Sequence, residues 1–197
     1  MFSFFQKDPP LLKVCKSVSK KNAPVHAPSN HEELAGAFGW LTVSTCLLFF
    51  KEMIVTFKEI PLIKKHRLNE DAAFFETLTF FIVALHLYLD SHPYNAKTKE
   101  QITLVIAYAM TFVTISHPEW DTEKIFTTRS TDYLKGDEIN KFISNFVLSL
   151  ASEKVKLLYE PNFSYEVMKP IILRGIPLYL GGYHSAIDRV LERYPRK

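Results

Sequence analysis

A stripe of polar residues within an otherwise apolar segment holds the side chains best suited to chemistry. Its members recur at intervals of three and four residues, which place them on one face of an α-helix: Glu76, Thr79, Val83, His86 and Asp90. His86 and Asp90 are four residues apart, so the carboxylate can meet and orient the imidazole ring. An imidazole held in this way is a common general base in enzymes. The candidate residues for binding a ligand or a partner are therefore Glu76, Thr79, His86 and Asp90.

The stripe has two main interpretations. In the functional interpretation, the polar side chains form a seam that enters a pocket. In the structural interpretation, they form a narrow solvent-facing stripe on a helix that is otherwise buried, because most of the surrounding residues are apolar. Burial of His86 and Asp90 without any function is a third outcome. We expect the solvent-facing stripe.

The motifs that usually mark catalytic, metal or cofactor sites do not occur in this sequence. Neither Gly-x-x-x-x-Gly-Lys nor Gly-x-Gly-x-x-Gly is present, so the two glycine-rich phosphate loops are excluded. His-Glu-x-x-His, Glu-x-x-His, paired cysteines and the nucleophile motif Gly-x-Ser-x-Gly are also missing. We therefore assign no catalytic residue, metal ligand or cofactor, and we lean against an enzyme. Gly181 and Gly182 are expected to form a turn before the last helix.

The segments that must position the stripe are predicted to be helical. Asn30 and Asn69 each come shortly before two acidic residues, a pattern that favours the start of a helix. Short alternating strands joined by hairpin turns do not occur. The expected helices cover residues 31–60, 70–89, 98–117, 119–134, 137–159, 165–174 and 183–194, with Pro177 in a turn between the last two. The sequence thus predicts an all-α fold, a single bundle-like domain of about six or seven helices over residues 30–197.

Residues 1–29 differ from the rest of the chain in composition and charge. The first 30 residues hold five lysines and one aspartate, whereas the remainder is close to neutral. A near-neutral body lacks the clustered basic face that nucleic-acid binding needs, so we expect no nucleic-acid partner. The segment is rich in proline and serine, and its apolar residues follow no sustained helical or strand period. We therefore predict a basic, largely irregular N-terminal tail that is dispensable for folding. Within this tail, four apolar residues are spaced so that they can form one short helical turn that docks on the domain: Leu11, Leu12, Val14 and Val18.

The expected location is the cytoplasm. The aromatic run Met1–Phe5 lacks the length of the apolar core of a secretory signal. Cys15 and Cys46 have no cysteine or histidine partner at metal-ligand spacing, and unpaired thiols suit a reducing compartment. Three apolar segments are short or interrupted by polar groups, so we expect core helices of a soluble bundle rather than membrane spans: residues 34–50, 72–89 and 102–116.

With no catalytic constellation, the function expected from the sequence is a non-catalytic protein-interaction module, such as an adaptor, an inhibitor or an immunity-type partner. The alternative is a binding module for an apolar small molecule, because 16 phenylalanines can line a cavity as well as fill a core. An enzyme that uses His86 and Asp90 is the third candidate. The expected partner is another protein.

Overall fold

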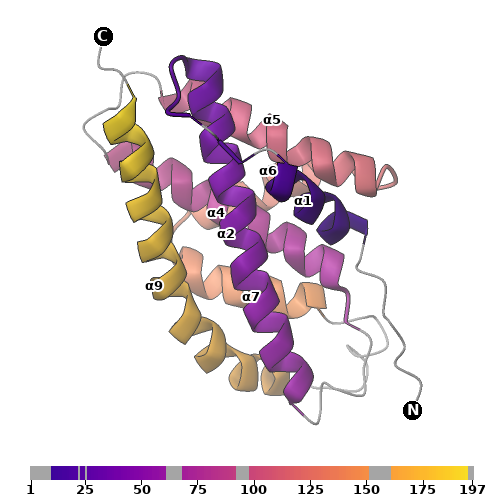
Figure 1. Cartoon of the computed structure of the whole chain (residues 1–197). Helices are drawn as coiled ribbons and strands as arrows, with labels where there is room; N and C mark the ends of the chain where they lie inside the picture. The colour runs from indigo at the N-terminus through magenta and orange to yellow at the C-terminus, as the bar shows by residue number, and fades with distance from the viewer. Residues whose placement is uncertain are drawn as a thin grey trace, which may run out of the picture.

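Helices form the whole of the regular structure in the described part of the chain (Figure 1). The structure, a computed structural model, describes residues 10–21, 23–24, 26–60, 68–91, 98–150 and 161–194, with the backbone alone for 98–99 and 161–165. Within these ranges it has seven helices and no strand, so the predicted all-α fold is confirmed. The helices are α1 (Pro10–Lys21), α2 (His31–Glu59), α4 (Glu70–Ser91), α5 (Thr98–Ser116), α6 (Thr122–Leu134), α7 (Glu138–Leu150) and α9 (Pro161–Arg193).

Helix α4 lies at the centre of the bundle. Asn69 caps it, as predicted, by accepting a hydrogen bond from the backbone N–H of Ala72 at 3.3 Å. The helix is apolar around most of its circumference and contacts every other helix that the structure describes. A helix of this kind is stable in the middle of a bundle, because each side buries its surface against a neighbour. The polar stripe therefore lies on a deeply buried helix.

Helix α2 begins at the predicted cap and packs closely on α5. The side-chain oxygen of Asn30 accepts a hydrogen bond from the backbone N–H of Glu33 at 2.9 Å. Gly39 does not break the helix, which continues to Glu59. A Cβ atom placed on Gly39 would lie 2.7 Å from Cδ1 of Tyr108 in α5. The glycine therefore permits a close contact between the two helices.

Phenylalanine rings from α2, α4 and α7 fill the centre of the bundle. Phe80 and Phe142 stack with their ring centroids 4.3 Å apart, and Phe50 meets Phe74 edge to face at 5.3 Å. These are favoured aromatic geometries. Phe146 of α7 is fully buried. Apolar residues at intervals of three and four predict this buried face of the helix: Ile139, Phe142, Ile143, Phe146, Val147 and Leu150. The predicted continuation of this helix to residue 159 falls in residues 151–160, outside the described residues.

The N-terminal segment contains the docked helix that the sequence allows within an irregular tail, and this helix is longer than the single expected turn. Within residues 1–29, Pro10–Lys21 form a 12-residue helix, and its Leu11, Leu12 and Cys15 join the hydrophobic core. Lysines occupy the opposite face, so the helix is amphipathic. A helix of this length is only marginally stable by itself, so its stability comes from docking on the core. Residues 1–9 lie outside the described residues. Deletion of residues 1–28 should therefore lower the stability of the domain, contrary to the expectation from composition.

The last helix differs from the prediction of two short helices and a turn. Helix α9 continues through Pro170 and Pro177 without a break. A proline inside a helix costs about 3 kcal/mol, because it removes a backbone hydrogen bond and crowds the preceding turn. Burial of the apolar face that includes Ile176 and Tyr183 offsets this cost. The Gly181–Gly182 pair consequently lies inside the helix, on its exposed side, and not in a turn.

Helices α2 and α4 are long and apolar enough to cross a membrane, judged by length and composition alone. In this structure, 56% and 72% of the residues in their most apolar stretches are buried inside the bundle. The central helix of a soluble bundle and a membrane span share this composition. Hydropathy by itself therefore does not separate the two roles.

Candidate functional site

The polar stripe on α4 divides into a buried half and a partly exposed half. Glu76, Thr79 and Val83 are 2%, 0% and 3% exposed, so this half does not face solvent as the sequence had led us to expect. The side chains of His86 and Asp90 are 28% and 46% exposed. Side chains from α6 and α7 cover Glu76, since Tyr133, Arg129 and Asn145 contact it. The same spacing therefore places side chains in two different environments.

Glu76 is the centre of a buried polar cluster that joins α4, α6 and α7. The hydroxyl of Tyr133 donates a hydrogen bond to Oε1 of Glu76. The guanidinium of Arg129 lies with Nε 3.5 Å from Oε2 of Glu76, and its Nη1 donates to Oδ1 of Asn145 at 2.9 Å. The amide of Asn145 in turn reaches the Tyr133 hydroxyl at 3.5 Å. The four side chains thus satisfy one another, with Arg129 reaching in from the surface, where its side chain is 36% exposed.

Burial changes the proton affinity of this cluster. Removal from water raises the pKa of Glu76, although Tyr133 and Arg129 act in the opposite direction. Burial and the nearby carboxylate also raise the pKa of Tyr133, so the phenol keeps its proton and acts as the donor. Through its contacts with Tyr133, Arg129 and Asn145, the Glu76 side chain joins α6 and α7 to α4. We therefore assign the Glu76 cluster a structural role.

Thr79 uses its hydroxyl within its own helix. Its Oγ1 donates to the backbone carbonyl of Phe75 at 3.0 Å, and the residue is fully buried. This bond occupies the hydroxyl proton. Thr79 therefore belongs with Glu76 to the buried half of the stripe.

His86 and Asp90 form the second half of the stripe, near the surface. Nε2 of His86 lies 3.3 Å from Oδ2 of Asp90, so the predicted pairing of the two side chains is present. Nδ1 of His86 is buried and makes no hydrogen bond. Ten residues of helix separate His86 from Glu76, which corresponds to about 15 Å at 1.5 Å per residue. The four candidate residues are therefore not brought together into one site.

A second polar cluster holds α1 in place. Asp71, at the start of α4, accepts hydrogen bonds from the first two buried backbone N–H groups of α1, both at 3.4 Å. Nε2 of His117 lies 2.8 Å from the same carboxylate, and its Nδ1 lies 2.9 Å from Glu119. The imidazole ring also stacks on Trp120 with centroids 3.9 Å apart. Asp71 therefore caps the start of α1, and its carboxylate also lies in the first turn of α4, where negative charge is favourable.

A third cluster lies between α4 and α9. The Tyr88 hydroxyl donates to Asp188 at 2.7 Å, and its ring stacks on His184 at 4.0 Å. The hydrogen bond to Asp188 raises the pKa of Tyr88 to about 12, and burial lowers the pKa of His184. These contacts tie the C-terminal half of α9 to the end of α4. Sequence spacing gave no sign of this cluster, because its members are about 100 residues apart.

The sequence signals the buried cluster through Glu76 alone and does not indicate the three residues that contact it. A carboxylate in the middle of an apolar helix needs a buried partner, so Glu76 implies one. Tyr133, Arg129 and Asn145 lie on two other helices, and no local pattern distinguishes them from neighbours of the same type. Their identity depends on how α6 and α7 pack, which is a property of the tertiary structure.

Two findings complete the description of the site. Among the residues that the structure describes, no three histidine, cysteine or acidic side chains gather as metal ligands would. Comparisons with protein-family models, with curated proteins and with solved structures found no match to this chain. The functional argument therefore rests on the surfaces of the bundle and on its core.

Proposed function

We propose that the protein is a non-catalytic interaction module that binds a partner protein through the outward side of α5. This surface, called the α5 face below, consists of Leu104, Ala107, Thr111, Thr114 and Ile115. All five residues are exposed, and Leu104 and Ile115 are 38% and 65% exposed. The observation that carries the proposal is the lack of charged residues along the exposed side of α5 after its first turn.

No charged residue occurs between positions 101 and 116, on either side of α5. Exposed helix faces in soluble proteins usually carry charged side chains, since these stay hydrated and discourage association. A neutral exposed face therefore resembles the contact side of a helix that packs on another protein.

The spacing and chemistry of the α5 face suit packing against a partner helix. Leu104, Ala107, Thr111 and Thr114 follow intervals of three, four and three residues, the spacing of a helix–helix seam. The Thr111 hydroxyl donates to the carbonyl of Ala107 at 2.7 Å, and the Thr114 hydroxyl lies 3.2 Å from that of Thr122. Because these hydroxyls have partners within the chain, the face offers mainly methyl groups. Small side chains at the centre permit close approach of a second helix.

The two other candidate functions have less support. An apolar ligand needs an open cavity, whereas the phenylalanine rings of the core pack directly on one another. An enzyme that uses the polar stripe needs its carboxylates and imidazole to converge, whereas Glu76 is buried among α6 and α7 and His86 lies about three turns away. The protein-interaction function requires neither feature.

Site-specific photo-cross-linking in the native cell tests the proposal. A photoreactive amino acid replaces Ile115 in the full-length chain, and a matched chain carries it at Leu148, an exposed leucine on α7. We expect Ile115 to give a discrete adduct with one protein, identified by mass spectrometry, and Leu148 to give none. Adding Ala107→Glu should reduce the Ile115 adduct about tenfold or more, because a charge is then desolvated in the contact.

The same experiment can contradict the proposal. Equal labelling from Ile115 and Leu148 would mean that the α5 face has no specific partner. Labelling of lipid alone from Ile115 would assign the α5 face to a membrane instead. The Ala107→Glu chain must melt within a few degrees of the unmodified chain, which shows that the loss of the adduct is not a loss of folding.

A further inference from the structure

We propose that a second surface, on the side of the bundle formed by α1, α2 and α9, docks on an anionic lipid surface. This surface, called the basic–apolar face below, combines three exposed aliphatic side chains with basic side chains around them: Leu48, Val55 and Leu178, with Lys16, Lys20, Lys51 and Arg174. It is separate from the α5 face, and the proposal does not depend on the proposed function.

The apolar part of this face is formed by α2 and α9. Leu48 and Val55 are seven residues apart, so they lie on the same side of α2, and they are 61% and 53% exposed. Leu178 of α9 is 72% exposed. Its neighbour Tyr179 donates a hydrogen bond to Glu52 of α2, so this turn of α9 lies against the part of α2 between Leu48 and Val55. Three large aliphatic side chains therefore reach solvent along two adjacent helices.

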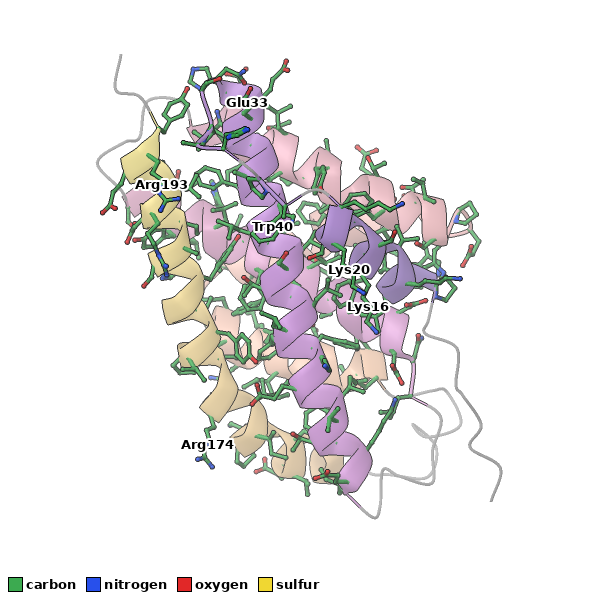
Figure 2. All side chains as sticks on the ribbon, viewed as in Figure 1. Lys16, Lys20, Glu33, Trp40, Arg174 and Arg193 are labelled. Carbon is green, nitrogen blue, oxygen red and sulfur yellow. The ribbon has the colours of Figure 1, made fainter. Side chains whose placement is uncertain are left out.

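Basic side chains flank this apolar strip. On one side, α1 is attached to α2 through the hydroxyls of Ser19 and Ser44, 2.8 Å apart. Figure 2 shows Lys16 and Lys20 of α1 beside α2, and Arg174 on α9 at the other side of α2. Lys51 is exposed on α2 between Leu48 and Val55. The charge around the strip is therefore mainly positive.

Acidic side chains on this face are few or engaged. Glu52 adjoins Lys51 and accepts the hydrogen bond from Tyr179, and Glu59 is exposed at the end of α2.

The combination of aliphatic and basic side chains distinguishes a lipid surface from a neutral protein surface. Each basic side chain near an anionic bilayer contributes about 1 kcal/mol, or about fivefold in the partition coefficient. Aliphatic side chains that enter the interface add a hydrophobic contribution, and stable binding usually needs both. The α5 face, by contrast, offers no charge to attract an anionic surface.

Vesicle co-sedimentation of the full chain tests this proposal. The probes are phosphatidylcholine vesicles and phosphatidylcholine vesicles that contain about 30% phosphatidylserine, at low and at moderate salt. We expect binding to the anionic vesicles alone, and weaker binding at higher salt, because salt screens the basic side chains. Lys20→Gln with Lys51→Gln should lower the partition coefficient about 25-fold. Leu48→Ser with Leu178→Ser should lower it about tenfold or more.

Matched variants on α6 and α7 serve as controls, because they change the same residue types at exposed positions elsewhere. Lys124→Gln with Lys135→Gln and Leu134→Ser with Leu148→Ser should bind like the unmodified chain. Absence of binding to anionic vesicles at low salt would overturn the proposal. Equal losses in the test and control pairs would also overturn it, since binding would then depend on net charge or hydrophobicity alone. If vesicles are not bound and an acidic helical peptide binds through Lys20 and Lys51, the face serves a protein and the proposal is wrong.

Discussion

Glu76 and His86 occupy the same side of α4, yet α6 and α7 cover the first, and the second reaches solvent. Glu76 has partners on two other helices, whereas the bond seen for the His86 side chain joins it to Asp90, one turn away on its own helix. A buried carboxylate is costly unless it is hydrogen-bonded, so its partners bind the helices together. An exposed pair competes with water and contributes little. Spacing along a helix therefore places side chains on one side but does not determine their energetic role.

The largest expected effect concerns α7, which supplies Asn145 to the Glu76 cluster and Phe146 to the aromatic core. Phe146→Ala should lower the free energy of unfolding by about 3–5 kcal/mol, because the side chain is fully buried and its removal leaves a cavity. Leu148→Ala on the same helix is the control, since Leu148 is exposed. Chemical denaturation measures both. A Phe146→Ala chain as stable as the Leu148→Ala chain would mean that α7 is not packed in the core.

A smaller loss is expected at the centre of the buried half. Glu76→Ala should destabilise the protein by about 1–3 kcal/mol, because Tyr133, Arg129 and Asn145 lose a shared partner in the interior. Glu123 on α6 is exposed, and Glu123→Ala should change the stability by less than about 0.5 kcal/mol. The two variants are compared by urea unfolding. Equal effects would place Glu76 among ordinary surface carboxylates.

The raised pKa of Glu76 predicts a pH dependence. The folded protein holds the Glu76 proton more tightly than the unfolded chain does, so protonation favours folding. Relative to Glu76→Gln, the unmodified protein should lose stability as the pH rises from about the ordinary value of 4.5 through the raised pKa, and the difference should then stay constant. Urea unfolding of both chains across this range measures the difference. A gain of stability over the same range would mean that Arg129 favours the ionised carboxylate.

The smallest effects are expected in the exposed half. His86→Ala and Asp90→Ala should each change the stability by less than about 0.5 kcal/mol, because a partly exposed pair on one helix contributes little. Thermal melts of the two chains provide the measurement. If Asp90→Ala lowers the stability as much as Glu76→Ala, the Asp90 carboxylate is a buried partner that His86 requires. The two halves of the stripe would then contribute equally to stability.

The sequence predicts the parts of this structure that depend on local chemistry. Asn30 and Asn69 cap their helices as expected, and Phe146 lies in the core. The predictions failed where packing between distant segments decides the outcome. Pro177 lies inside a helix because burial of α9 offsets its local cost, and Pro10–Lys21 fold because the core accepts three of their side chains. The partners of Glu76 could not be predicted for the same reason.

The division of the stripe is tested most directly by two double-mutant cycles on the free energy of unfolding. One cycle combines Glu76→Gln with Tyr133→Phe, and the other combines His86→Ala with Asp90→Ala. The structure predicts a coupling of about 1 kcal/mol or more for the first pair, which is buried and lies on two helices. It predicts less than about 0.5 kcal/mol for the second pair. Equal couplings, or a larger coupling between His86 and Asp90, would contradict the assignment of Glu76 to a structural cluster and His86 to the surface.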